Sequence, residues 1–332
     1  MYKTRTASDH STDTSIVARV SKIPLYLNCL YDACMDQKIL GAGKILELCV
    51  DIENLNDIVT NHQLMSAIVR LLNDCSEKAN DVLRFHLVRI LMCLSDFDEF
   101  HIVLSQLLVG SSIMNMIHRH LIYLQKVGRP DEHECKNDEL CIYSALILLK
   151  NLSSNIEIER KMVGKGLLEM LSKCLGIYGK NCVQVSEVIL EFLLKLTIVE
   201  ANVIQLICCE IVHILCDLLI INSVEVVSMT LKVLFNLSFN IDVRKSLTRN
   251  GIFEKIINLL KRPTHRAKSL CLLYHMSVDL ENLDIVGAHK ELANILYKLI
   301  LNFPKKELPS VLLATLINVS ILYNIIISLE IC

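Results

Sequence analysis

The sequence predicts an all-α solenoid, on the evidence of its apolar composition, its few turn residues and a recurring helical segment. Of its 332 residues, 52% are hydrophobic, slightly above the roughly 45–50% of ordinary soluble domains. There are 10 glycines and 5 prolines, well below the usual proportions of about 7% and 5%. β-Sandwiches, barrels and nucleotide-binding α/β folds need more turn residues or glycine-rich loops, so the composition favours helices.

A six-residue signature, approximately L-L-x-N-L-S, recurs along the chain. Its central positions are Leu48, Leu94, Leu152, Leu196, Leu237, Met276 and Val319. Subtracting successive numbers gives spacings of 46, 58, 44, 41, 39 and 43 residues. Most of these lie at or near the period of roughly 40–47 residues that is typical of armadillo and HEAT repeats.

The residues after each signature distinguish these two repeat types. In two copies a short amphipathic segment follows, then a glycine (Gly166 or Gly251), then a second apolar helix. Glycine suits a tight helix junction that requires positive φ. A long helix, a short helix and a helix after glycine are typical of armadillo repeats, whereas HEAT repeats are usually helix pairs. The predicted fold is therefore an all-α, right-handed armadillo-repeat superhelical solenoid of about seven units.

We expect a disordered N-terminus over residues 1–15 and a single solenoid over residues 16–332. The polar segment 126–139, which contains Gly128 and Pro130, predicts a loop inserted between helices. Segments 185–198 and 203–221 are apolar all round and are expected to be helices covered on both sides. The last unit is expected to be truncated, because the sequence ends within a repeat without a polar cap.

The segment 311–329 carries no charge and is long enough to be a membrane anchor. The alternative is a helix pair of the last repeat, and Asn318 lies within the repeat signature. Several polar residues dilute the apolar run, so the helix pair is favoured and no membrane insertion is expected.

The sequence carries no motif of a known catalytic centre, and we expect neither an enzyme nor a bound cofactor. The net charge of −2 provides no excess of positive charge that would attract nucleic acid, so nucleic-acid binding is not expected. The nearest candidate for a metal site has a spacing that fits no common pattern, so solvated side chains are favoured and no metal is expected. That candidate comprises His118, His120, His133 and Cys135.

The cysteine content and the N-terminus indicate the cytoplasm. The sequence has fourteen cysteines but no CxxC pair, and it has no signal peptide.

Polar residues at one signature position predict a protein-binding groove. Asn151, Asn236 and Asn318 share this position, and Lys195 and His275 occupy it in two other units. Amides on the inner helices of a solenoid can bind the backbone of an extended peptide. The alternative is that each asparagine caps its own helix or ties down the next turn. Lys232 lies one turn before Asn236, and Lys195 and Lys232 are expected to favour acidic ligands.

The complete absence of tryptophan argues against receptors of the importin-α type, which pair each groove asparagine with a tryptophan.

The serines at the end of the signature are expected to be packing residues at helix ends, not nucleophiles. These serines are Ser95, Ser153, Ser238, Ser277 and Ser320.

Several segments resemble the kinesin-associated protein, the non-motor accessory subunit of heterotrimeric kinesin-II. The clearest is 230–279, which contains LFNLSFNIDVRKSL and CLLYHMSVD. The segments 96–121 and 187–206 are also similar to this family, and the order is collinear over most of residues 39–330. The long charged segment of the family is shortened here to 126–139, and its N-terminal region and C-terminal tail have no counterpart.

The resemblance implies a non-enzymatic adaptor that binds the C-terminal tails of kinesin-II motor subunits and links them to cargo proteins. It also implies microtubule-based, ciliary or intraflagellar transport, with the protein in the cytoplasm, the cytoskeleton and the cilium or flagellum. The alternative is a membrane-tethered or soluble armadillo scaffold for other protein partners.

Overall fold

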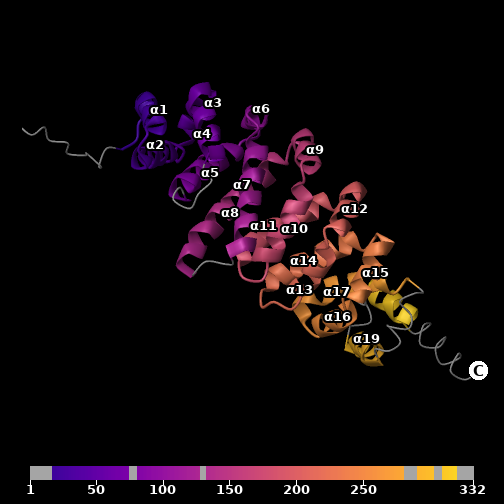
Figure 1. The fold of residues 1–332 in the computed structure, drawn as a ribbon. Coiled ribbons are helices and arrows are strands. Elements are labelled where there is room, and N and C mark those ends of the chain that lie inside the picture. The colour runs from indigo at the N-terminus through magenta and orange to yellow at the C-terminus, as the bar shows by residue number, and fades with distance from the viewer. Residues whose placement is uncertain (1–16, 75–80, 128–131, 280–289, 303–308, 320–332) are drawn as a thin grey trace, which may run out of the picture. The chain divides into compact units, whose positions relative to one another are not determined.

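A computed structural model describes residues 17–74, 81–127, 132–279, 290–302 and 309–319. Every regular element within these ranges is a helix (Figure 1). The chain forms two compact units, residues 1–112 and 113–332. The boundary falls inside helix α7, Val109–Val127. The predicted disordered segment 1–15 lies outside the described residues.

The first unit is built from short helices that pack around aliphatic side chains. Helix α1 packs on α2 and α4, and α5 packs on α2 and α4. Leu30, Ile45 and Leu87 are completely buried among these helices. The helices of this unit are α1 (Ile23–Tyr31), α2 (Met35–Leu48), α3 (Leu55–Thr60), α4 (His62–Asp74), α5 (Asp81–Ser95) and α6 (His101–Gln106).

The second unit contains a row of long helices in which each packs on the next (Figure 1). These are α8 (Glu132–Leu152), α11 (Val183–Leu196), α14 (Val224–Leu237) and α17 (Pro263–Met276). Each ends at the central residue of a repeat signature. Helix α2 also ends there, at Leu48, and α5 ends one residue after Leu94. The sequence period therefore corresponds to one structural repeat, and the predicted armadillo-type all-α fold is confirmed.

A short helix and a third helix follow each of the first three long helices of this unit. The short helices are α9 (Ile156–Gly164), α12 (Glu200–Cys208) and α15 (Ile241–Arg249). The third helices are α10 (Leu167–Tyr178), α13 (Ile211–Leu218) and α16 (Ile252–Leu260). Asn155 and Asn240 cap α9 and α15, because each side chain accepts hydrogen bonds from two backbone N–H groups of the first turn. Helix α19 (Lys290–Asn302) packs on α16.

The junction between the short and the third helix has positive φ in four repeats. Gly166 (φ 92°) and Gly251 (φ 67°) occupy it as the sequence predicts. Glu210 (φ 56°) and Leu108 (φ 57°) occupy the equivalent junctions. The prediction of one continuous helix over 203–221 is therefore wrong: the apolar run bends between α12 and α13 even though it contains no glycine.

The predicted loop over 126–139 is also wrong over most of its length, because α7 continues to Val127 and α8 begins at Glu132. Gly128 and Pro130 lie between the two helices, outside the described residues. The acidic residues Glu132 and Glu134 occupy the first turn of α8, where the helix dipole favours negative charge. The polar composition thus marks the start of a helix.

Within the described ranges, no single helix is both long and apolar enough to cross a membrane. Two helix pairs, 98–106 with 109–126 and 200–208 with 211–218, reach the necessary length and composition, but they are bent by 72° and 86°. The suggested anchor 311–329 is described over its first nine residues, within helix Ser310–Val319. The rest of that segment lies outside the described residues.

Candidate protein-binding groove

The exposed side of three successive long helices forms a shallow hollow of about 270 Å³. Because α11, α14 and α17 pack directly on one another, residues of three repeats meet at this surface. The hollow is lined by Leu194, Leu231, Lys232, Phe235, Asn236, Lys268 and Cys271. Two lysines thus border a mainly apolar floor.

The other lysines of this helix face are neutralised by carboxylates. Lys150 of α8 forms an ion pair with Glu191 of α11 (Nζ–Oε2 2.5 Å). Lys195 lies 2.6 Å from Glu159. Within the described part of the protein, Lys232 and Lys268 have no carboxylate partner. The hollow is therefore the positively charged part of the face, and it offers cations together with apolar contact area.

The residues at the signature position that was predicted to bind a peptide form hydrogen bonds between successive repeats. Asn236 Nδ2 donates to Thr197 Oγ1 (3.1 Å) and Asn318 Nδ2 donates to Ser277 Oγ (3.0 Å). His275 Nδ1 lies 2.8 Å from Ser238 Oγ. In each case the acceptor is the hydroxyl at the end of the preceding signature. Lys195 follows the same rule, because its Nζ donates to the carbonyl oxygen of Ser153 and lies 3.3 Å from its hydroxyl.

These hydroxyls are buried and also donate to their own helix. Ser153, Ser238 and Ser277 donate to the carbonyl three residues earlier, at 2.6, 2.7 and 2.8 Å. Each hydroxyl thus uses its proton within its own helix and presents a lone pair to the next repeat. The predicted packing role of these serines agrees with their burial. Their use as acceptors for the next repeat was not predicted.

A second set of side chains satisfies the carbonyl groups that the long helices leave without intrahelical partners. In four repeats a side chain of the following turn or helix donates to the carbonyl oxygen six residues earlier. These pairs are Asn54 with Leu48, His101 with Ser95, Asn202 with Leu196 and Arg244 with Ser238. Such bonds fix the angle between the long helix and the segment that follows it.

The repeat of α8 and α9 departs from this pattern, because Glu159 occupies the position of the donor. A carboxylate cannot donate, and Lys195 from the next long helix donates to the Ser153 carbonyl instead. The same ammonium group lies 2.6 Å from Glu159 Oε2 and forms an ion pair with it. The Glu159 side chain is 6% exposed.

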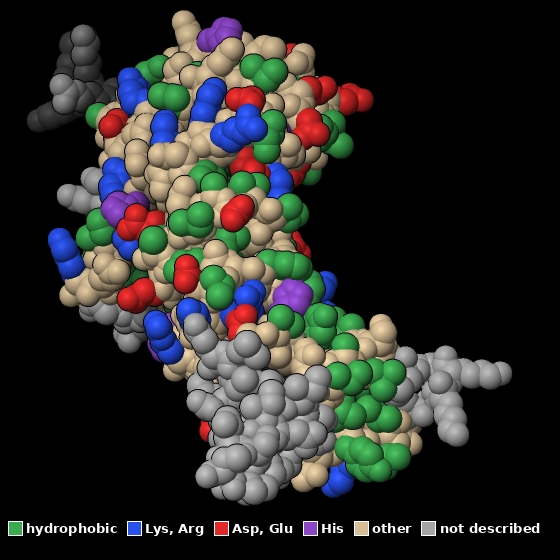
Figure 2. All heavy atoms as spheres, turned by 90° about the vertical axis from the view of Figure 1, so that its right-hand side faces the viewer, with side chains coloured by type: hydrophobic (Ala, Val, Ile, Leu, Met, Phe, Trp, Pro, Cys, Tyr) green, Lys and Arg blue, Asp and Glu red, His purple; other side chains and the backbone are tan. Residues whose placement is uncertain are grey.

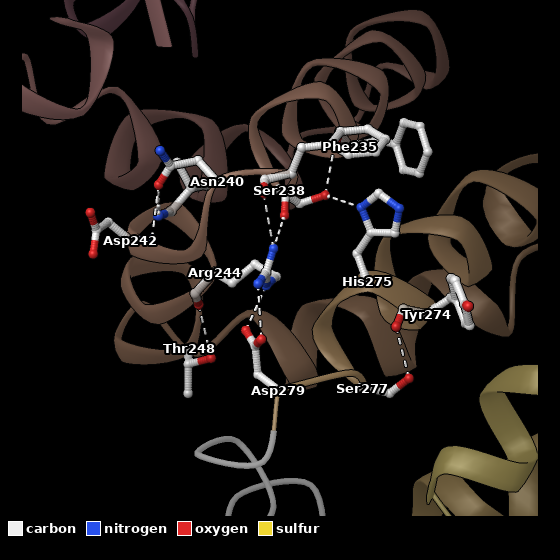
Figure 3. A network of polar contacts seen from close by, with 12 residues as sticks. Phe235, Ser238, Asn240, Asp242, Arg244, Thr248, Tyr274, His275, Ser277 and Asp279 are labelled. Atoms are coloured by element: carbon white, nitrogen blue, oxygen red, sulfur yellow. Dashed lines mark hydrogen bonds and ion pairs between the residues drawn. The ribbon is translucent and has the colours of Figure 1, made fainter. Parts of the chain in front are cut away.

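At the α14–α15 junction the cation belongs to the repeat itself and the carboxylate belongs to the next repeat, the opposite of the arrangement after α8. Arg244 donates to the Ser238 carbonyl within its own repeat (2.8 Å) and to both carboxylate oxygens of Asp279 after α17. The distances to Asp279 are 2.5 and 2.9 Å, and both side chains are about 15% exposed. Figure 3 shows Arg244 between the Ser238 carbonyl and the Asp279 carboxylate.

His275 lies beside this network, stacked on Phe235 at a centroid distance of 4.6 Å and in edge contact with Phe239 at 4.4 Å. Because the Ser238 hydroxyl donates to Phe235 O, the network assigns the His275 proton to Nδ1. Burial, and secondly the nearby Arg244 guanidinium, lower the pKa of His275. His275 is therefore held neutral as a link between repeats.

The four residues of the metal candidate are only partly described. His120 Nε2 lies 2.7 Å from the Tyr178 hydroxyl, and His118 is exposed on the same helix. The side chains of His133 and Cys135 lie outside the described residues. No group of three or more metal-ligating side chains occurs in the part of the chain that the structure describes.

Sequence reasoning placed Lys232 and Asn236 at the hollow but missed Leu194, Phe235, Lys268 and Cys271. Lys268 and Cys271 precede His275 by seven and four residues, so they share its helix face. Counting back from the signature by helical turns would have identified them. The structure places Asn151 on α8, away from the hollow.

A sequence model of a family described as kinesin-associated protein (KAP) matches residues 2–128 and 124–328. Solved structures that share the fold include designed armadillo repeat proteins. One, designed computationally for modular peptide recognition, aligns with a TM-score of 0.59 at 16% identity, over 76% of this chain and 99% of its own. Another, in complex with the peptide (KR)4, aligns with a TM-score of 0.56 at 16% identity, over 77% and 99%.

Proposed function

The chain belongs to the kinesin-associated protein family, and from this membership we propose that it is a non-enzymatic adaptor for kinesin-II. The adaptor binds the C-terminal tails of the motor subunits and connects them to cargo proteins in ciliary or intraflagellar transport. It acts in the cytoplasm, on the cytoskeleton and in the cilium. Its fold is that of a repeat scaffold, which recognises partners through a surface and not through a catalytic centre.

The hollow on α11, α14 and α17 carries this proposal. Lys232 and Lys268 supply two cations that have no carboxylate partner among the described residues, and Leu194 and Phe235 supply apolar area in the same hollow. A tail segment with acidic residues on either side of a large apolar residue complements this surface. The hydrogen bonds between repeats hold the three helices in register, so that a partner meets a preformed surface.

Titration of fluorescent peptides from the C-terminal tails of kinesin-II motors tests the proposal. We expect the native tails to bind at least about ten-fold more tightly than scrambled tails of the same composition, a difference of about 1.4 kcal/mol. The double variant Lys232→Glu/Lys268→Glu should lose most of this binding, and the affinity should fall as salt rises. Equal binding of native and scrambled tails would disprove the proposal.

Lys161→Glu is the matched control for the single charge reversal Lys232→Glu, which should weaken binding less than the double variant. Lys161 is an exposed lysine on the short helix α9, off the long-helix face. This variant should bind the tails as the unmodified protein does. If it weakens binding as much as Lys232→Glu, net charge and not the hollow governs the interaction.

A further inference from the structure

A second exposed surface lies at the ends of the long helices, next to the short helices. The residue directly after the signature hydroxyl is apolar in three successive repeats. These residues, here named the apolar ridge, are Ile198, Phe239 and Val278, and they are 78%, 67% and 57% exposed. Large apolar side chains exposed at the same position of consecutive repeats are typical of an interaction surface.

The space between the first two ridge residues is hollow, with a volume of about 440 Å³. Its lining residues are Thr197, Ile198, Glu200, Val203, Asn236, Phe239 and Asn240. Phe239 is held in place although it is exposed, because it makes edge contacts with Phe235 (centroids 5.4 Å) and His275 (4.4 Å). A fixed aromatic wall loses little freedom when a partner binds. Figure 2 shows hydrophobic side chains gathered toward the lower, C-terminal part of its view.

The charge beside the ridge is negative. Glu200 and Asp242 are exposed in the first turns of α12 and α15. Neither carboxylate forms an ion pair within the described residues, and Figure 3 shows Asp242 directed away from Arg244. The nearby cations Lys195 and Arg244 are neutralised by Glu159 and Asp279. The ridge therefore offers apolar area with negative charge, the opposite sign to the hollow on the long helices.

The spacing of the repeats determines which partner fits. Packed helices lie about 8–10 Å apart, so three consecutive repeats place the ridge residues over about 20 Å. An α-helix rises about 1.5 Å per residue, and side chains seven residues apart are therefore about 10.5 Å apart. We infer that the ridge binds an amphipathic helix of a partner protein that carries one large apolar residue per heptad, flanked by lysine or arginine.

This inference concerns a surface next to the proposed motor-binding hollow, and Asn236 lines both. Because the two surfaces carry opposite charge, they select different ligands, an acidic segment and a basic helix. Each surface disfavours the ligand of the other, since like charges repel.

The probe is a labelled helical peptide of about three heptads with one leucine per heptad, flanking lysines and alanine elsewhere. We expect it to bind the full chain at least ten-fold more tightly than two control peptides. One control has the same composition with the leucines distributed around the helix, and the other has glutamate in place of lysine. Phe239→Ser and the pair Glu200→Lys/Asp242→Lys should each weaken binding at least ten-fold.

Ile220→Ser is the matched variant, because Ile220 is 70% exposed but lies after α13, away from the ridge. It should bind the probe normally, as should Lys232→Glu, and circular dichroism should confirm that every variant is folded. Equal binding of the probe and the peptide with distributed leucines overturns the inference. So does an equal effect of Phe239→Ser and Ile220→Ser, or tighter probe binding in Lys232→Glu, which would place the basic helix in the other hollow, where Lys232 repels it.

Discussion

The junctions after α8 and after α14 solve the same structural problem with opposite arrangements of charge. Both must satisfy the carbonyl group of a buried serine, Ser153 or Ser238. After α14 the donor is Arg244 of the same repeat, and its charge is balanced by Asp279 of the next. After α8 the donor is Lys195 of the next repeat, and the balancing Glu159 belongs to the repeat itself. In both places an ion pair joins neighbouring repeats.

The comparison shows that the armadillo unit requires a donor at the end of each long helix but does not fix which repeat provides it. Neutral donors such as Asn202 satisfy the carbonyl locally, and the next repeat is held there by packing and by the uncharged hydrogen bond from Asn236 to Thr197. Charged donors add a connection between units. Because a solenoid is stabilised by its units and their interfaces together, the two charged junctions should contribute most to cooperativity in this region.

The largest effect should follow from replacing the arginine at the second junction. Arg244→Met leaves Asp279 without its bidentate partner and the Ser238 carbonyl without its donor. Both side chains of the pair are mostly buried, so we expect the local free energy of unfolding to fall by about 3 kcal/mol. Hydrogen exchange of the amides in α15 and α17 measures this. Arg249→Met, on the exposed part of the same helix, should change it by less than about 0.5 kcal/mol.

A smaller loss is expected at the first junction. Lys195→Met leaves the buried Glu159 unpaired, but Lys195 itself is 43% exposed. Solvent therefore weakens the pair, and we expect a loss of about 2 kcal/mol in α9 and α11. Adding Glu159→Gln should recover about half of this, because a neutral amide has no charge to desolvate and can donate to a carbonyl.

Lys150→Met is the control for this junction, because its pair with Glu191 joins the same two repeats at the surface. It should cost less than about 0.5 kcal/mol. An equal loss for Lys150→Met and Lys195→Met would show that the burial of Glu159 contributes nothing.

Much of the fold could be predicted because the repeat signature is local in sequence. The recurring leucines mark helix ends, and the glycines Gly166 and Gly251 mark left-handed junctions. The bend at Glu210 could not be predicted, because an acidic residue inside an apolar run gives no signal of positive φ. Stacking of the neighbouring repeats imposes that conformation, against an intrinsic cost of about 1–2 kcal/mol.

The candidate site was predictable by position but not by role. The sequence placed Asn236, His275 and Asn318 at the same signature position, and the structure confirms that this position recurs on successive helices. It could not reveal that each side chain bonds to a hydroxyl about 40 residues earlier, since this depends on how the repeats stack. Lys195 and Glu159 were likewise unrecognisable as partners, because they are 36 residues apart in the sequence.

The smallest effect should be a pH dependence at the second junction. The pKa of His275 is lowered by burial, so below about pH 6.5 the unfolded chain takes up a proton that the folded chain resists. Stability should therefore fall as the pH decreases from about 7.5 to 5.5. His275→Asn keeps a donor for Ser238, as Asn236 does for Thr197, but cannot titrate. The variant should lose less stability than the unmodified protein over this range.

The comparison must be made as a difference between the two proteins, because burial also lowers the pKa of His265 in both. Arg244→Met provides a second check. Removing the guanidinium removes one of the two causes of the lowered pKa, so the dependence on pH should become shallower in this variant. Parallel pH profiles for all three proteins would show that His275 contributes to the stack through its rings and its hydrogen bond alone, with no contribution from its protonation.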